Sequence, residues 1–153
     1  TVAIDLEWRP DAPHRGMNRP SLLQLSTATS VWLLDLEMPE FAGANELLDQ
    51  VMALLASNEH RVLGFGIQGD LDRLQLLCRR EPSAAPLVAR RVVDLRDACL
   101  SAASATAAPP APSCEPGLAA QLHAWTGLSL DKAEQCSDWA ARPLSASQLA
   151  YAA

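Results

Sequence analysis

The chain has 153 residues, of which 49% are hydrophobic, so it is long and apolar enough to bury the core of one ordinary domain. Its formal net charge of −6 argues against a protein that grips duplex nucleic acid by charge alone, although it is compatible with an enzyme that binds divalent cations. The four cysteines are widely spaced and form no CxxC pair, so they signal neither a zinc site nor a disulfide framework and are typical of reduced intracellular thiols.

The first stretch, TVAIDLEWRP, begins with a strand pattern in which apolar side chains alternate with Ala3, Asp5 and Glu7. Asp5 and Glu7 therefore point to the same side of the strand, where residues two apart lie roughly 7 Å from each other. Two carboxylates at this spacing repel each other unless solvent or a cation lies between them. A sheet edge in water and a metal site both account for the pair.

After a loop rich in Pro and Arg at residues 9–20, apolar patterns predict the next six elements. In chain order they are two strands, a helix, a strand, a helix and a strand-like run, at residues 21–27, 30–36, 44–57, 61–66, 67–80 and 91–99. The first of these strands is expected to pair with the opening strand. This order predicts a mixed α/β sheet with helices packed on it.

The C-terminal third opens with a segment of low complexity, rich in Ala and Pro, at about 101–116, which we interpret as a flexible insertion. A helix is predicted at about 117–125, with Gly127 as its stop. Ser145 and Gln148 form a capping-box pattern, so a last helix is expected to begin near Ser145.

Three acidic residues and a tyrosine stand where this order of elements can bring them together. Asp5 and Glu7 share a strand face, Asp70 lies where a helix follows a strand, and Tyr151 lies on the last helix. Carboxylates beside a phenol fit a two-metal phosphoryl-transfer site, and oxygen ligands select Mg²⁺ or Mn²⁺ over zinc. Asp70 could equally serve by opposing the helix dipole, and Tyr151 by packing.

Four stretches carry a family resemblance. In order, VAIDLEW, RPSLLQLST, LGFGIQGDLDRL and LDKAEQCSDWAARPLSASQLAYAA resemble the motifs of the DEDDy 3′–5′ exonucleases, in the branch of RNase D, the Werner exonuclease and Nibbler (Mut-type). The resemblance spans residues 1–153 apart from the insertion. It implies an RNase H-like fold, with a mixed sheet of about five strands, the first three antiparallel, flanked by helices. It also implies a metal-dependent 3′–5′ exonuclease that releases nucleoside monophosphates from the 3′ end of a nucleic acid.

The same resemblance implies roles for individual residues. Asp5, Glu7 and Asp70 match the family's metal ligands for two Mg²⁺ or Mn²⁺ ions, and Tyr151 matches the tyrosine that orients or activates the attacking water. The last motif's Asp would fall two positions beyond Ala153. We therefore expect the chain to be an excerpt of a larger polypeptide that is truncated before that Asp and is a poor nuclease on its own.

Leu6 within the acidic strand, and Trp8 and Gln24 beside it, are expected to contact the substrate's terminal nucleotide, although Trp8 fits a core position equally well. Charged residues in the first loop suit either phosphate contacts or a solvated surface. They are Arg9, His14, Arg15 and Arg19. Trp139 is interpreted as packing, and Asp94 resembles a family position to which we assign no chemical role.

A second hypothesis is a nuclease-like module that binds nucleic acid or a partner protein without cleavage. The repelling acidic pair argues against it, because a binding module has no need of such a pair. Neither DNA nor RNA is favoured by any residue. The sequence predicts no membrane span, and we expect an intracellular protein, with nucleus and cytoplasm undistinguished.

Overall fold

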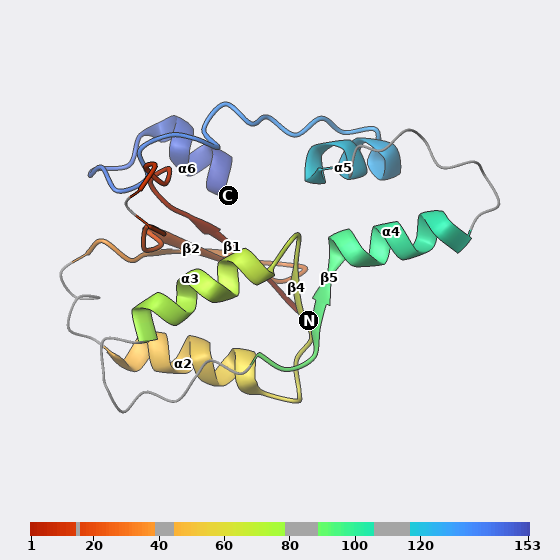
Figure 1. Cartoon of the computed structure of the whole chain (residues 1–153), viewed down its shortest axis with the longest axis horizontal. Helices are drawn as coiled ribbons and strands as arrows, with labels where there is room; N and C mark the ends of the chain where they lie inside the picture. The colour runs from red at the N-terminus through yellow and green to blue at the C-terminus, as the bar shows by residue number, and fades with distance from the viewer. Residues whose placement is uncertain (15, 39–44, 79–88, 106–116) are drawn as a thin grey trace.

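A computed structural model of the chain describes residues 1–14, 16–38, 45–78, 89–105 and 117–153 (Figure 1). These residues form one mixed five-stranded sheet in the order β3-β2-β1-β4-β5. The strands are β1 (Val2–Glu7), β2 (Leu22–Ser26), β3 (Val31–Asp35), β4 (Val62–Gly64) and β5 (Val92–Asp94). The first three are antiparallel, whereas β4 lies parallel to β1 and β5 parallel to β4. The predicted sheet is confirmed, and β1 is its central strand.

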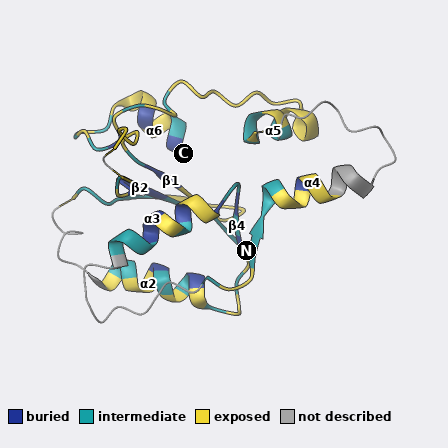
Figure 2. Cartoon of the chain, viewed as in Figure 1, coloured by how far each residue is buried: buried dark blue, intermediate teal, exposed yellow. Residues whose placement is uncertain are grey.

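One face of the sheet carries the main core. Ile4 and Leu6 of β1 point to this face, where α2 (Asn45–Ala56) and α3 (Gln68–Cys78) cover the sheet. Figure 2 shows buried positions along both helices. The buried members of this cluster are Ile4, Leu6, Leu23, Val51, Leu55, Val62, Ile67 and Leu74. Since side chains alternate along a strand, Asp5 and Glu7 are left on the opposite face.

That opposite face is covered in part by α6 (Ala146–Ala152) and the segment that precedes it. Ala152 and the fully buried Trp139 pack against Leu22, which lies directly across from Glu7 in the antiparallel pair. The predicted capping box is present, because the Ser145 side chain accepts from the backbone of Gln148 and the Gln148 side chain accepts from the backbone of Ser145. The C-terminal helix therefore begins as the sequence predicts, beside the acidic end of β1.

Two predictions in the second half of the chain are wrong. The strand-like run at 91–99 ends at Asp94, because α4 (Leu95–Ala105) starts directly after β5. The Asp94 carboxylate accepts from the backbone N–H of Arg96 and so caps the helix, whose following residues are mostly good helix formers. Residues 101–105 of the predicted insertion are accordingly helical, and the rest of it lies outside the described residues.

The helix predicted at about 117–125 is confirmed as α5 (Leu118–Thr126). Gly127 ends it in the left-handed conformation (φ 71°) and donates its N–H to the carbonyl of His123. Among the helices that the structure describes, none is long and apolar enough to cross a membrane. Cys99, which is buried, and Cys136, which is exposed, are both free thiols.

Candidate active site

The acidic pair lies on the central strand. β1 is the central strand of the sheet, with Asp5 opposite Gln24 and Glu7 opposite Leu22 on the β2 side. On the other side β4 pairs only with Val2 and Ala3, so it is the burial of Glu7 that argues against a solvated sheet edge. Asp5 still reaches solvent above the sheet, whereas Glu7 is only 8% exposed.

Burial raises the pKa of both carboxyl groups, and the charge of Asp5 adds to the rise at Glu7. The pKa of Glu7 rises to about 7, first because burial disfavours its charged form and then because Asp5 is a like charge nearby. A hydrogen bond from Gln24 Nε2 to Glu7 Oε1 (3.1 Å) opposes part of this rise. The pKa of Asp5 is also raised, because the surrounding protein excludes solvent from its carboxylate, and a hydrogen bond from the Leu6 N–H opposes part of this rise. Both groups therefore hold protons more tightly than ordinary acids.

Asp70 joins this pair from α3. It lies in the helix's first turn, only 6% exposed, and its pKa rises to about 8 through burial, Asp5 and Glu7, against the opposing charge of Arg73. The helix dipole does favour a carboxylate in the first turn. The raised pKa nevertheless shows that burial and the neighbouring acids outweigh any such benefit.

The turn that presents Asp70 is held by Asp94. Its two carboxylate oxygens accept from the backbone N–H groups of Gly66 (2.9 Å) and Ile67 (3.1 Å), directly before α3. Gly66 has φ 66°, a left-handed conformation that side chains rarely adopt. Asp94, which had no assigned chemical role in the sequence analysis, therefore orders the turn between β4 and α3.

Tyr151 approaches the acidic pair from α6. Its ring packs against Trp139 with centroids 5.8 Å apart and planes inclined by 47°, so it does have the packing role considered above. Burial, Glu7 and Asp5 together raise the pKa of its hydroxyl to about 12. Four groups on β1, α3 and α6 thus share one electrostatic environment.

The donors in this environment suit a hard cation. Within the described parts of the chain, no three His, Cys, Asp or Glu side chains are arranged closely enough to hold a metal ion as they stand. The groups that Asp5, Glu7 and Asp70 offer are carboxylate oxygens, the ligands that Mg²⁺ and Mn²⁺ prefer. The repulsion that raises the pKa values of Glu7 and Asp70 is the kind that a bound cation reverses. The residues present therefore fit a divalent metal.

The three residues expected to touch substrate lie in different surroundings. Gln24 lies on the same face of the sheet as Asp5 and Glu7, and its side chain donates a hydrogen bond to Glu7. The Leu6 side chain is 2% exposed within the main core, so any contact with substrate would fall to its backbone. Trp8 packs against the same core, and the guanidinium carbon of Arg73 lies 3.8 Å from its ring centroid.

Arg73 is a residue that sequence reasoning missed. It is 7% exposed and lies one helical turn after Asp70, a spacing that could have indicated it. Besides stacking on Trp8, it pairs with Asp11 and donates to the carbonyl of Asn18 (2.6 Å). Arg73 therefore ties the loop after β1 to the helix that carries Asp70.

The charged residues of that loop mostly have protein partners. Arg9 makes a two-point ion pair with Asp138 (2.9 Å for each contact), and Arg19 pairs with Glu37. His14 is exposed, and Arg15 lies outside the described residues. Phosphate contact by Arg9 or Arg19 would have to compete with these ion pairs.

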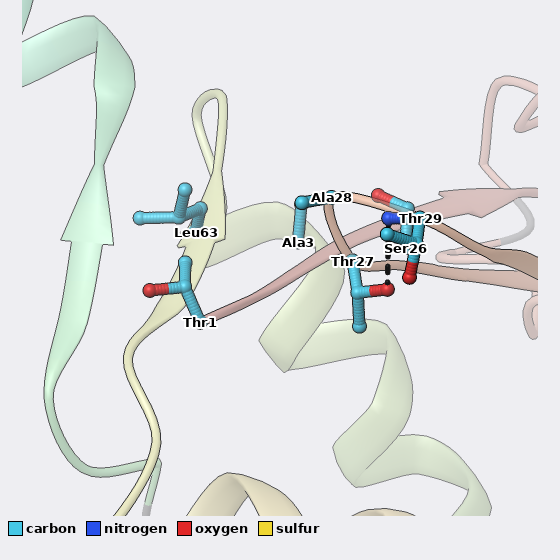
Figure 3. Close-up of a pocket in the computed structure, with 7 residues that line it drawn as sticks. All are labelled: Thr1, Ala3, Ser26, Thr27, Ala28, Thr29 and Leu63. Atoms are coloured by element: carbon cyan, nitrogen blue, oxygen red, sulfur yellow. Dashed lines mark hydrogen bonds between the residues drawn. The ribbon is translucent and has the colours of Figure 1, made fainter.

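A pocket of about 490 Å³ continues the acidic face toward the start of β1 (Figure 3). Ala3, Ser26 and Leu63 lie at one level of the sheet, two residues along the strands from the Asp5–Gln24 pair. Threonine side chains, with Ala28, complete the lining; they are Thr1, Thr27 and Thr29. These side chains carry hydroxyl and alkyl groups only, so the acids needed for hydrolysis lie outside the pocket.

Comparison with known proteins agrees with this geometry. The family model described as "3'-5' exonuclease" matches residues 1–153. The human exonuclease mut-7 homolog is 34% identical over 99% of this chain, although the chain spans only 18% of that protein's length. The solved EXO domain of Aedes aegypti Nibbler superposes with a TM-score of 0.78 at 25% identity, covering 99% of this chain and 70% of that one. Trypanosoma brucei RNase D in complex with RNA U12 shares the fold, with a TM-score of 0.73 at 23% identity over 99% of this chain and 50% of that one. The chain therefore belongs to the 3′–5′ exonuclease family, in the DEDD-type branch with the RNase H-like fold.

Proposed function

We propose that this domain, within the larger polypeptide expected from the sequence, is a metal-dependent exonuclease that releases nucleoside monophosphates from the 3′ end of a nucleic acid. The observation that carries the proposal is that three carboxyl groups from two elements lie close enough to interact: Asp5 raises the pKa of Glu7, and both raise the pKa of Asp70. A protein that only binds nucleic acid gains nothing from this repulsion. A hydrolase that binds cations through hard oxygen ligands does need such a cluster of carboxylates, and the repulsion is the consequence of the cluster.

Asp5, Glu7 and Asp70 would hold Mg²⁺ or Mn²⁺, with two ions as in the family. Such ions supply the Lewis acidity that activates water and stabilises the departing 3′ oxygen. Gln24 orients Glu7 through its amide, and Asp94 orients the turn before Asp70. These contacts preorganise the carboxylates before substrate arrives.

Tyr151 would orient the attacking water. Because its pKa is about 12, the phenol stays protonated at neutral pH and can donate or accept a hydrogen bond. A group so weakly acidic is a poor general base near neutrality. Positioning the water is therefore the role that suits Tyr151.

The proposed substrate is defined by its 3′ end, and the proposal does not depend on recognition of particular bases. RNA is one strand to include in any test, because the related RNase D structure from Trypanosoma brucei holds RNA U12. DNA is the other. The chain spans only 18% of the length of the human relative, so the activity of that whole protein is not assigned to this domain.

The test is a degradation assay of the full-length protein on matched DNA and RNA strands labelled at the 5′ end, with Mg²⁺ or Mn²⁺ and with EDTA as control. We expect a ladder that shortens from the 3′ end, release of nucleoside monophosphates, and arrest by EDTA. Asp70→Asn should abolish the ladder. Strands that are bound but never shortened, with either metal, would instead support a binding module.

A further inference from the structure

Tyr151 lies on a helix that needs outside support. α6 has seven residues, and helices of this length are marginal in water on their own. The position of the Tyr151 hydroxyl therefore depends on contacts that join α6 to the rest of the protein. Packing of Ala152 on Leu22 and Trp139 is one such contact.

Gln148 supplies a second contact, and a more specific one. Its side chain is 7% exposed and uses both ends of its amide. The oxygen accepts from the backbone N–H of Ser145 (2.9 Å), which completes the helix cap. The nitrogen donates to Ser137 Oγ (3.0 Å) and to the carbonyl of Asp138 (3.3 Å). One buried side chain thus joins the start of α6 to the segment before it.

This segment leads directly to the aromatic partner of Tyr151. Trp139 follows Asp138, is fully buried, and donates its indole N–H to the carbonyl of Glu134 (3.0 Å). Gln148 and Tyr151 are three residues apart and so lie on the same side of the helix. Gln148 therefore fixes both the helix that carries Tyr151 and the ring against which Tyr151 packs.

We propose that Gln148 is a positioning residue for Tyr151, which it holds beside Asp5 and Glu7 by tying α6 to residues 137–138. The inference rests on the proposed function, because it deepens the role of Tyr151 in the same site. Gln148 acts through hydrogen bonds within the protein rather than through contact with substrate. Loss of its amide donor should loosen the phenol while leaving the carboxylates in place.

The chain offers variants that separate this role from helix capping. Gln148→Glu keeps an oxygen acceptor for the Ser145 N–H but removes the donor to Ser137 and Asp138. Ser137→Ala removes one acceptor from the other side and is a small change that should fold. Gln50→Glu, on an exposed position of α2, introduces the same charge elsewhere and is the matched control.

Each variant is made with and without Tyr151→Phe. We expect Gln148→Glu to lower kcat by about 10- to 100-fold, as small misplacements of a reacting group do, with KM changed by less than about twofold. In the Tyr151→Phe background the same substitution should lower kcat no further. Gln50→Glu should leave kcat unchanged in both backgrounds. An equal loss of kcat in both backgrounds would overturn the proposal, because the effect would then bypass the hydroxyl.

A second measurement does not depend on activity. Tyr151 is the single tyrosine of the chain, so fluorotyrosine incorporation gives one fluorine NMR resonance that reports its surroundings. The resonance should shift or broaden in Gln148→Glu and Ser137→Ala but not in Gln50→Glu. If the unmodified protein cleaves no strand, the proposed function fails while this spectrum still tests the positioning. A resonance that is unchanged in both variants would refute the inference.

Discussion

The side-chain amide of Gln24 donates a hydrogen bond to the carboxylate of Glu7, with Nε2 and Oε1 3.1 Å apart. The two residues lie on adjacent strands and on the same face of the sheet, since Gln24 stands opposite Asp5 and Glu7 is two residues further along β1. This bond favours the charged form of Glu7 and opposes the burial and the Asp5 charge that raise its pKa to about 7. Gln24 therefore keeps Glu7 ionisable near neutral pH.

Removal of the Gln24 amide should shift the acidic limb of the pH–activity profile to higher pH. In Gln24→Leu, which has similar volume and no amide, the pKa of Glu7 should rise further above about 7. Activity that requires ionised Glu7 should then appear only at higher pH. The measurement is kcat/KM against pH with Mn²⁺ held constant. A rise in KM with an unshifted profile would instead assign Gln24 to substrate contact alone.

The raised pKa values also predict how stability depends on pH without metal. Between the unfolded values near 4 and the folded values of about 7 for Glu7 and about 8 for Asp70, the folded protein binds more protons than the unfolded one. The free energy of unfolding should therefore fall as pH rises through this window. Asp70→Asn removes one of the two groups, so it should flatten the fall and leave the variant more stable than the unmodified protein near pH 8.

Urea unfolding in EDTA, at several values from about pH 5 to pH 8, checks this prediction. Asp72→Asn, an exposed change two residues further along α3, is the matched control and should leave the slope unaltered. Added Mg²⁺ should restore stability at high pH in the unmodified protein, because a cation favours the charged carboxylates. Stability that rises with pH in EDTA would contradict the coupled-acid description of the site.

Cleavage itself should depend on the acidic pair of β1. Asp5→Asn and Glu7→Gln preserve side-chain volume but remove a charged oxygen ligand, so each should abolish strand shortening while the fold persists. Mn²⁺ binding followed by calorimetry should weaken in parallel. Circular dichroism controls for the fold. Substantial activity in either variant at the same Mn²⁺ concentration would place the chemistry elsewhere.

Local signals in the sequence predicted the elements that local interactions determine. The alternation around Asp5 and Glu7 indicated β1, Gly127 indicated the end of α5, and the Ser145–Gln148 pattern indicated the start of α6. Each depends on residues that are neighbours in the chain, so one sequence is enough to detect it.

Contacts between distant residues could not be found in this way. Arg73 is 62 residues from Asp11, and Asp94 is 28 residues from Gly66. The end of β5 was also missed, because the Asp94 cap that starts α4 resembles an ordinary polar position in a strand. These residues acquire their roles through contacts that exist only in the folded structure, and the fold also brings Asp70 close to Asp5 and Glu7 of β1.

Asp94 should control the placement of Asp70. Asp94→Ala removes the acceptors for the N–H groups of Gly66 and Ile67 and for that of Arg96, so it should lower the free energy of unfolding by about 1–3 kcal/mol. Catalytic rate should fall as well, because the turn before Asp70 loosens. Asp97→Ala, an exposed position in the first turn of α4, is the control for a lost charge. If Asp94→Ala changes the rate and the stability no more than Asp97→Ala does, Asp94 does not control the placement of Asp70.

Tyr151→Phe should separate water positioning from metal binding. The substitution keeps the ring that packs against Trp139, at a centroid distance of 5.8 Å, and removes only the hydroxyl beside Glu7 and Asp5. Since groups that position or transfer a proton typically contribute about 10²- to 10⁴-fold, kcat should fall within that range. Mn²⁺ affinity should hold steady, because the carboxylates that serve as ligands are unaltered. Thermal unfolding should change little, which distinguishes this variant from one that disrupts α6. Unchanged turnover would leave Tyr151 with its packing role alone.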